Sequence, residues 1–450
     1  MLKRKIANRI EDYLRSPKNK MLIVDGARQI GKSYIIRYVG KLLYPNYIEI
    51  NMEEDKNGRQ LFANVRTTSD FYMAVSAIAG SRMKDAQNTL IFIDEIQAYD
   101  HLLTLVKFLM QEGRYTYIAS GSQLGITLRK TQSIPGGSYE SIRMYPLDFE
   151  EFLWANGVGE LAIEGMRRAF DNQEALNEGM HNQMMDFLHK YLLVGGLPDA
   201  VNTFIEEQNI VKIRRIHNDI HDLYLNDAAK YEIETGRKLK IQRIYSMVPS
   251  IMENRKKRVV AKNIEDKKGK RMTDYQDEFD YLSAAGITLE CRAISKPSYP
   301  LCQNEGKNLL KLYLNDVGML TAILYRNNLK AVMEDACCID LGSVYETLVA
   351  QELTAHGMGC YYYDNKKNGE VDYLVDDTKN LTTLPIEVKS GKDYTVHSAL
   401  DKFLSIDEYN IHQAYVLSNE RRVFQSKGII YVPIYYIMFF DSSNEVTGSF

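Results

Sequence analysis

The sequence feature that most constrains this chain is a loop of the form Gly26-x-x-x-x-Gly31-Lys32-Ser33. The apolar run 21–25 before it predicts a short strand, and the run 34–43 after it predicts a helix. Gly26 lets the chain turn sharply off the strand, and Gly31 lets backbone N–H groups approach an anion. A strand, this loop and a helix are typical of a phosphate-binding loop, and they predict an α/β fold for the surrounding segment.

The residue types in the loop predict how a nucleotide would bind. The helix points the positive end of its dipole at the phosphates. We expect Lys32 to reach the β- and γ-phosphates of ATP and to act in catalysis, and the Ser33 hydroxyl to coordinate Mg²⁺. The predicted nucleotide-binding residues are Gly26, Ala27, Arg28, Gln29, Ile30, Gly31, Lys32, Ser33 and Tyr34.

A second motif supports this interpretation. Residues 89–97, TLIFIDEIQ, form an apolar run that ends in two acids, as a buried parallel strand with a Walker B motif does. We expect Asp94 to hold Mg²⁺ through water, and Glu95 to orient and polarise the attacking water. The alternative, a buried strand with two acids at its solvated end, is weakened by the loop upstream.

The strand predicted at 115–120 ends in a serine-rich turn. In ATPases with an additional strand, a polar residue at the tip of this strand senses the γ-phosphate. Ser120 and Ser122 are both candidates, and an ordinary turn remains the alternative. Alternating strands and helices up to residue 125 predict a mainly parallel sheet with nucleotide at its carboxyl edge.

Composition limits the partners that the chain can have. The net charge is −3, so any nucleic-acid surface must be local. The five cysteines show no CxxC spacing, which fits a reducing cytoplasm and argues against a zinc site. The longest apolar run, 428–440, contains Pro433 and is too short to span a bilayer. We therefore expect a cytoplasmic protein without a membrane partner.

The middle of the chain, 155–335, has a mostly helical pattern. Gly195-Gly196-Leu197-Pro198 predicts a sharp break between helices. A basic stretch, Arg255–Arg271, precedes a predicted helix (274–285) and a strand-like run, ITLECRAI. This order suggests a winged-helix module whose basic stretch contacts DNA phosphates, whereas the alternative is a solvated loop.

The last third predicts a second acidic centre. A helix is expected over 341–356, followed by strands at 359–363, 369–375 and 384–390. A hairpin would bring Asp372 beside Glu387, and two such carboxylates suit Mg²⁺. Lys389 shares a strand face with Glu387 and would activate water, while Glu346 would approach from the helix. The predicted catalytic residues here are Glu346, Asp372, Glu387 and Lys389, with Asp372 and Glu387 as metal ligands. The alternative is a hairpin whose charges face water.

The ordered motifs resemble those of one group of proteins. They are GARQIGKS, LIFIDEIQ, IASGSQLGI, MYPLDFEEF, GGLPDA, KLYLNDVGML, GSVYETLVAQEL, EVDYLV and IEVKSG. The set is similar to prokaryotic AAA-type ATPases, relatives of the archaeal-ATPase group, that carry a C-terminal domain of unknown function. The resemblance implies ATP binding, a winged-helix-like middle domain and a restriction-endonuclease-like C-terminal domain of the PD-(D/E)xK type. The family's arginine finger has no clear counterpart, although Arg143 lies near a plausible loop.

These observations predict three domains: an additional-strand, AAA-like P-loop ATPase domain at 1–150, a helical and winged-helix-like domain at 151–308, and an α/β restriction-endonuclease-like domain at 309–450. The leading hypothesis is an Mg²⁺-dependent ATPase coupled to a nuclease-like domain that acts on DNA. The DNA would be bound through Arg255–Arg271 and the C-terminal domain. One alternative is a nucleotide-dependent switch that binds DNA or protein without cutting. A second is a protein-remodelling ATPase, which would need a hexameric ring, so a homo-oligomer stays open.

Overall fold

The computed structural model describes residues 2–16, 19–122, 137–227, 235–254, 257–265, 269–304, 309–326, 328–333, 341–391 and 393–442. The chain forms two compact units, residues 1–145 with 284–286, and residues 146–283 with 287–450. None of the described helices combines the length and apolar character needed to cross a membrane.

The first unit is built on a five-stranded sheet with strand order β2-β3-β4-β1-β5, in which every pairing is parallel. Strand β4 lies between the loop strand β1 and the acidic strand β3, which is the additional-strand order. The predicted α/β fold with a parallel sheet is confirmed. The strands are β1 (Met21–Asp25), β2 (Asn46–Asn51), β3 (Thr89–Asp94), β4 (Thr116–Gly121) and β5 (Tyr139–Arg143).

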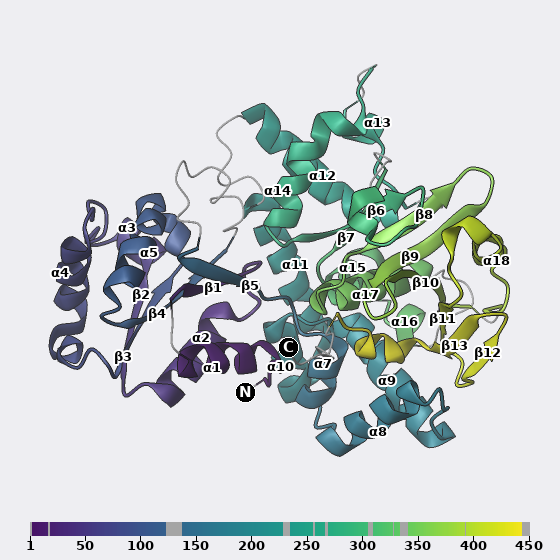
Figure 1. Ribbon diagram of the computed structural model, residues 1–450, viewed down its shortest axis with the longest axis horizontal. Helices are drawn as coiled ribbons and strands as arrows, with labels where there is room; N and C mark the ends of the chain where they lie inside the picture. The colour runs from purple at the N-terminus through teal and green to yellow at the C-terminus, as the bar shows by residue number, and fades with distance from the viewer. Residues whose placement is uncertain are drawn as a thin grey trace. The chain divides into compact units, whose positions relative to one another are not determined.

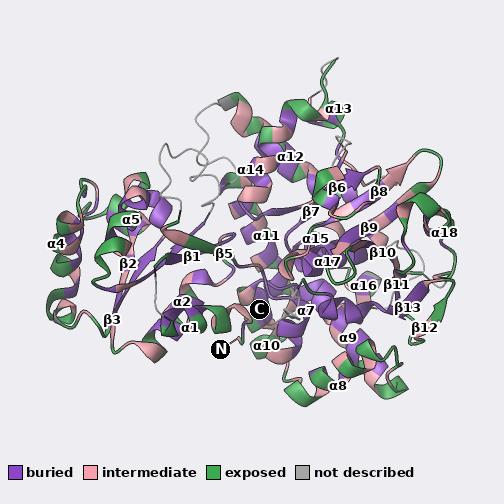
Figure 2. Ribbon diagram, in the orientation of Figure 1, coloured by how far each residue is buried: buried purple, intermediate pink, exposed green. Residues whose placement is uncertain are grey.

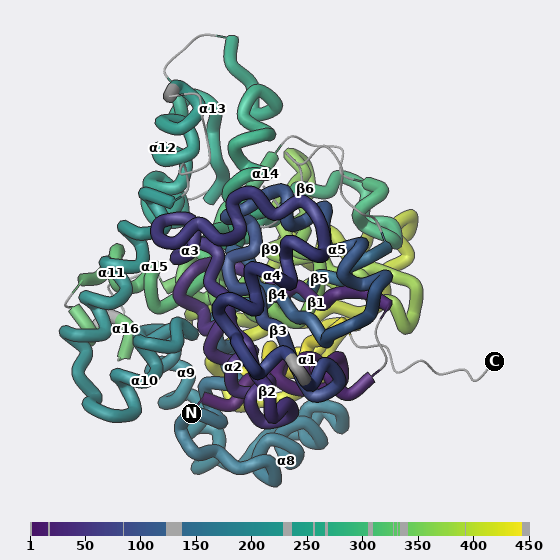
Figure 3. The backbone as a smooth tube through the Cα atoms, turned by 90° about the vertical axis from the view of Figure 1, so that its left-hand side faces the viewer, coloured from purple at the N-terminus to yellow at the C-terminus, as the bar shows by residue number. Residues whose placement is uncertain are grey.

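Helices cover both faces of this sheet. Strands β1 and β3 are buried along their whole length, whereas the edge strand β5 carries exposed residues, coloured green in Figure 2. Helices α1 and α2 lie side by side in Figures 1 and 3, and α2 packs on β2, β3 and β4. The helices are α1 (Ile6–Arg15), α2 (Lys32–Leu43), α3 (Met52–Asn57), α4 (Thr68–Ala79) and α5 (Asp100–Glu112).

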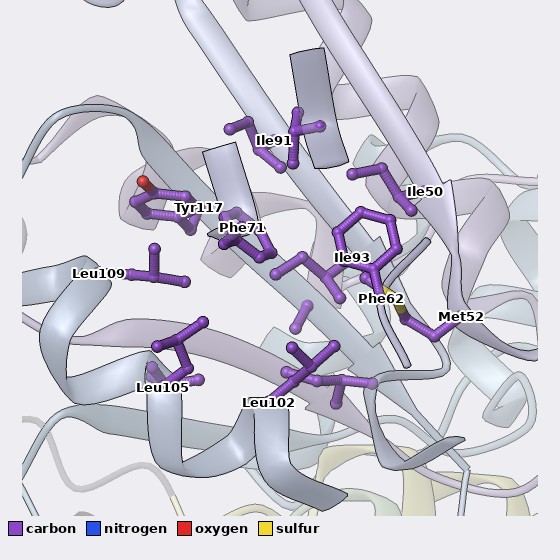
Figure 4. Close-up of a cluster of buried hydrophobic side chains, with 14 of the residues drawn as sticks. Ile50, Met52, Phe62, Phe71, Ile91, Ile93, Leu102, Leu105, Leu109 and Tyr117 are labelled. Carbon is purple, nitrogen blue, oxygen red and sulfur yellow. The ribbon is translucent and has the colours of Figure 1, made fainter. Parts of the chain in front are cut away.

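An apolar core fixes the opposite face of the same sheet. Side chains of α4 and α5, such as Phe71 and Leu105, pack against Ile91 and Ile93 of β3 (Figure 4). This packing supports the strands β1, β4 and β3, which are parallel neighbours. Their carboxyl ends therefore lie at the same edge of the sheet. This edge carries the acidic motif and the serine-rich turn.

The second unit combines a helical layer with a large sheet. Its helices are α7 (Phe149–Ala155), α8 (Glu160–Asp171), α9 (Glu178–Val194), α10 (Pro198–Glu207), α11 (Ile210–Asp227), α12 (Thr235–Met252), α13 (Ala261–Ile264), α14 (Gln276–Ala284), α15 (Val317–Tyr325), α16 (Lys330–Met333), α17 (Gly342–Ala355) and α18 (Ser398–Leu404). Helix α17 packs on β6, β7 and β10, while α18 packs on β9. The helix expected over 341–356 corresponds to α17.

The sheet of the second unit has eight strands in the order β12-β13-β11-β10-β9-β8-β6-β7 (Figure 1). Strands β9 and β10 form the antiparallel hairpin expected from the sequence. The strands are β6 (Thr288–Ile294), β7 (Leu310–Leu314), β8 (Tyr361–Asn365), β9 (Gly369–Asp377), β10 (Thr382–Lys389), β11 (Ala414–Ser418), β12 (Phe424–Ser426) and β13 (Ile429–Pro433).

The middle of the chain differs from the expected winged-helix module. The strand-like run ITLECRAI is β6, which pairs in parallel with β8 and antiparallel with β7. It therefore belongs to the large sheet and is not the wing of a separate module. The domain boundary predicted at 308 falls between β6 and β7 in the sequence, and these two strands are hydrogen-bonded neighbours. Local pattern could not show this, since the partner of β6 lies far along the sequence.

The glycine pair between α9 and α10 is a close-packed junction. A Cβ atom on Gly196 would lie 2.0 Å from the Leu147 backbone oxygen, and one on Gly318 would lie 2.5 Å from Gly195 N. The buried Asp316 carboxylate accepts a hydrogen bond of 2.6 Å from Gly196 N. Burial raises the pKa of Asp316 to about 6. The expected helix break is therefore also a contact that only glycine permits.

Candidate functional site

The loop between β1 and α2 carries the predicted nucleotide-binding residues. Gly26 has a φ of 149°, and a Cβ there would lie 2.4 Å from Met144 O. Gly31 has a φ of 93° and directly precedes α2. Both positions therefore need glycine. Ala27 and Ile30 are buried, whereas Tyr34 in the first turn of α2 is 54% exposed.

Gln29 and Arg28 complete the loop. Gln29 has a φ of 61°, so the loop holds a non-glycine residue in the left-handed region. The Arg28 guanidinium lies 3.9 Å from Glu53 Oε1. Arg28 also adds positive charge near Lys32 and Glu95.

Lys32 is buried inside the loop. Its Nζ donates hydrogen bonds to the backbone oxygens of Gly26 at 3.0 Å and Ala27 at 2.7 Å. Burial lowers the pKa of Lys32, and the nearby carboxylates of Glu95, Asp25 and Asp94 oppose that change. The ammonium group is thus held at the loop, beside the acids at the end of β3.

Asp94 forms the centre of a polar network. Its carboxylate accepts hydrogen bonds from Ser33 Oγ at 2.9 Å, from Asn51 Nδ2 at 3.3 Å, and from Ser120 Oγ. Burial raises the pKa of Asp94, while the two serine hydroxyls oppose this. The predicted Mg²⁺ ligands Ser33 and Asp94 are therefore brought together.

Glu95 sits one residue further, where the chain leaves the strand. Its φ of 53° turns the side chain off the strand direction. Oε2 accepts hydrogen bonds from Ser122 Oγ at 2.7 Å, from Ser122 N at 3.3 Å and from Gln97 Nε2. Burial favours a higher pKa, but Lys32 and these hydrogen bonds outweigh it and lower the pKa of Glu95.

Both serines proposed as sensors contact the acidic motif, each through a different acid. Ser120 contacts Asp94, and Ser122 contacts Glu95. Sequence reasoning did not identify Asn51 or Gln97 as members of the site. Arg143, weighed as an arginine finger, lies in β5 beside its register partner Asp25 and forms a salt bridge of 3.0 Å with it.

The second predicted centre lies in the β9–β10 hairpin of the second unit. Asp372 Oδ2 accepts a hydrogen bond of 2.9 Å from Val388 N, so it faces the stretch of β10 that carries Glu387 and Lys389. Lys389 Nζ donates to Glu387 Oε1 at 2.8 Å. Glu387 is 5% exposed, and its Oε2 has no hydrogen-bond partner among the described residues.

Glu346 approaches this hairpin from α17, as expected, but its contacts are to cations. Lys257 Nζ lies 2.5 Å from Glu346 Oε1, and Lys311 Nζ lies 3.7 Å from Oε2. Tyr313 donates a hydrogen bond of 3.3 Å to Oε2. Lys311 is also 2.6 Å from Glu370 Oε1. Sequence reasoning missed Lys311, although a lysine inside the apolar run LKLYL signals a buried acidic partner.

Burial and neighbouring charges together set the pKa values in this cluster. Burial raises the pKa of Asp372 well above its usual value, and the like charges of Glu387 and Glu346 raise it further. Burial would raise the pKa of Glu346, but Lys311 and Lys257 outweigh burial and lower it. Burial would lower the pKa of Lys311, but Glu346 and Glu370 outweigh burial and raise it.

The metal prediction at this centre has limited support. The described residues contain no group of three or more His, Cys, Asp or Glu placed to hold a metal ion. The unpaired Oε2 of Glu387 next to Asp372 fits a cation, since hard carboxylate oxygens are the ligands that Mg²⁺ takes. Glu346, the catalytic residue predicted to approach from the helix, is paired with Lys257 and Lys311.

The basic stretch differs from the expected DNA-contact surface. Lys257 pairs with Glu346, and Arg258 lies 2.8 Å from Asp364, so both point into the second unit. Lys262, Lys270 and Arg271 are exposed. Arg255, Lys256, Lys267 and Lys268 lie outside the described residues. The expectation therefore holds at most for part of the stretch.

Comparison with known proteins gives a family match that includes most of the first unit. Residues 18–153 match the family model described as an AAA domain. Residues 185–330 and 341–437 match two models described as domains of unknown function, DUF8612 and DUF4143. Neither description names an activity, so the restriction-endonuclease-like fold and the winged helix gain no support from them.

Individual relatives are distant. An uncharacterized protein of Haemophilus influenzae is 24% identical over 186 residues, 40% of each chain, so the match spans about two fifths of that relative. A Walker-type ATPase of Pyrococcus abyssi is 14% identical, with 72% of this chain and 96% of that chain covered and a TM-score of 0.44. Hsp104 of S. cerevisiae bound to ADP is 12% identical, with 55% and 48% covered and a TM-score of 0.28. TM-scores this low carry no argument about this chain.

Proposed function

We propose that this protein binds ATP with Mg²⁺ and hydrolyses it in the first unit. The observation that carries the proposal is the convergence of Lys32, Ser33, Asp94 and Glu95 at the carboxyl ends of β1 and β3, within a segment that matches an AAA domain. The N-terminus of α2 and the loop N–H groups suit the phosphates.

Each residue then has a chemical role. Lys32 would exchange its bonds to the loop oxygens for the β- and γ-phosphates, and Ser33 with Asp94 would hold Mg²⁺. When bound, Mg²⁺ neutralises charge that develops on the phosphate oxygens. Glu95, kept ionised by Lys32 and Ser122, would accept a hydrogen bond from the attacking water and orient it in line with the bond to the leaving ADP.

Two substitutions test this proposal. Lys32→Ala should abolish ATP binding, because it removes the cation that pairs with the phosphates. Glu95→Gln should keep binding but lower hydrolysis by about a hundredfold or more, since it removes only the carboxylate. Binding is measured by titration calorimetry and hydrolysis by phosphate release. Wild-type hydrolysis in Glu95→Gln would exclude Glu95 as the base.

A second candidate function rests on the β9–β10 hairpin. Asp372, the unpaired Glu387 Oε2 and Lys389 suit a nuclease-like centre that acts on DNA, with a divalent cation held by the two carboxylates. Lys389 would orient the attacking water. Purified protein is incubated with plasmid, ATP and Mg²⁺ or Mn²⁺, and nicking is compared with Asp372→Ala. We expect Asp372→Ala to lose nicking and to keep ATP hydrolysis.

The pairing of Glu346 with two lysines favours the alternative, a nucleotide-dependent switch with a non-cleaving scaffold. The absence of nicking by the wild-type protein, together with ATP-dependent binding of DNA, would support that alternative.

Exposed Lys262, Lys270 and Arg271 are the described side chains of the basic stretch that would contact phosphates. Reversing their charges should flatten the salt dependence of DNA binding. A ring-forming homo-oligomer is tested by light scattering with and without ATP.

A further inference from the structure

The ion pair between Lys257 and Glu346 joins two distant parts of the second unit. Lys257 follows α12, whereas Glu346 lies in α17 and is buried. The Nζ to Oε1 distance is 2.5 Å, and the two side chains are 19% and 9% exposed. An ion pair this sheltered is screened little by water or salt.

The backbone at Lys257 is unusual. Its φ is 44°, in the left-handed region that non-glycine residues seldom adopt. Its N–H donates a hydrogen bond of 3.0 Å to Asn254 O. Such a conformation is strained for a residue with a side chain and persists only where other contacts hold it. Among the described residues, the ion pair that the Lys257 side chain forms is the one with Glu346.

The position of Lys257 distinguishes it from the other lysines of the cluster. Lys311 lies within β7, is 1% exposed and bridges Glu346 and Glu370, so the sheet fixes it. Lys389 pairs with its strand neighbour Glu387. Lys257 lies outside any strand or helix, and its side chain keeps a path to solvent. Both the backbone and the side chain of Lys257 can therefore move away from the cluster without moving a strand, whereas β7 and β10 fix the backbone positions of Lys311 and Lys389.

We propose that Lys257 acts as an internal counter-ion that keeps Glu346 from a divalent cation at the centre formed with Asp372 and Glu387. Cation binding at this centre then requires the Lys257 side chain to leave. The buried Glu387 Oε2, which has no partner among the described residues, indicates that the centre can accept a further positive group. This inference rests on the second proposed function, because it concerns regulation of that same centre.

Mn²⁺ binding in the absence of nucleotide tests the proposal. Lys257→Met removes the charge but keeps an unbranched side chain of similar length, and we expect it to bind Mn²⁺ at least about tenfold more tightly than the wild type. Lys107→Met is the matched control, because Lys107 is an exposed lysine in α5 of the first unit with no assigned role. Adding Asp372→Asn to Lys257→Met should remove the gain. Binding is measured by titration calorimetry on the full chain.

A second measurement uses the unmodified protein, in case Lys257→Met does not fold. Amine-reactive acetylation followed by peptide mass spectrometry reports exposure of each lysine. Saturating Mn²⁺ should increase labelling of Lys257 severalfold and leave Lys107 unchanged. If the wild type and Lys257→Met bind Mn²⁺ with equal affinity and Asp372→Asn loses this binding, the counter-ion role is overturned and the metal centre stands. Binding by neither protein, with unchanged labelling, would overturn both.

Discussion

Ser122 Oγ donates a 2.7 Å hydrogen bond to Glu95 Oε2, and the Ser122 backbone N–H approaches the same oxygen at 3.3 Å. The tip of β4 is therefore tied to the acid at the end of β3. A residue that stabilises an ionised carboxylate in this way also sets the pH at which that carboxylate can act.

Ser122→Ala should move the acidic limb of ATP hydrolysis to higher pH. The hydrogen bond favours the charged form of Glu95, so its loss raises the pKa of Glu95 and protonates the base at a pH where the wild type still works. The pH dependence of kcat measures the effect. Ser76→Ala, at an exposed serine in α4, is the control. An acidic limb unchanged by Ser122→Ala would separate Ser122 from the base.

Arg143→Ala should loosen the edge of the first sheet. Asp25 is buried, and without the guanidinium its carboxylate loses a charged partner at a cost of about 2 kcal/mol. Hydrogen exchange of β1 amides should accelerate by about thirtyfold. The double variant Asp25→Asn with Arg143→Ala should recover part of this protection, since the carboxylate that lost its guanidinium partner is then neutral. A double variant as labile as the single one would contradict the ion-pair explanation.

Gly196→Ala should destabilise the second unit by about 3 kcal/mol or more, because the new Cβ would overlap the Leu147 backbone oxygen. Gly165→Ala is the matched control. Gly165 lies within α8 and has no atom within 4 Å of its added Cβ, so alanine should stabilise the helix by about 0.5–1 kcal/mol. Urea unfolding followed by fluorescence of Trp154, the single tryptophan, reports on this unit. Equal effects of both substitutions would refute the close-contact argument.

Asp372→Asn should stabilise the second unit at pH 8 and have little effect near pH 4. The pKa of Asp372 is raised by burial and by Glu387 and Glu346, so folding favours its neutral form. The stability from this group is present below the unfolded pKa, about 4, and is lost as pH rises through the folded pKa. Asparagine stays neutral throughout. Urea midpoints by Trp154 fluorescence at both pH values measure the difference, and a gain confined to pH 4 would reverse the assigned sign.

Much of the first unit could be predicted from sequence because its signals are local. Gly26, Gly31 and the acids Asp94 and Glu95 stand at strand ends, and neighbouring parallel strands bring such ends together. The sequence could not decide whether Ser120 or Ser122 is the sensor residue. Both serines contact the acidic motif, Ser120 through Asp94 and Ser122 through Glu95. Asn51 and Gln97 were missed because a single amide side chain belongs to no sequence motif that indicates a nucleotide site.

The second unit was predictable only where partners are close in sequence. Asp372 and Glu387 are joined by one hairpin, and their proximity follows from strand pairing. Lys257 lies after α12, far from Glu346 in the sequence, and no periodicity encodes their contact. The basic composition around Lys257 suggested a solvated or DNA-contacting surface. In the structure, Lys257 pairs with Glu346 in α17, and Arg258 pairs with Asp364 in β8.

The place of β6 in the large sheet has a consequence for synthesis of the chain. Its parallel partner β8 lies at Tyr361–Asn365, so a chain growing on the ribosome exposes an open β6 edge until those residues emerge. Pairings between segments this far apart also form slowly. A fragment ending at residue 330, where one family match stops, would keep that edge permanently open. The two C-terminal family matches are therefore expected to be inherited, expressed and folded together, as one indivisible piece of polypeptide.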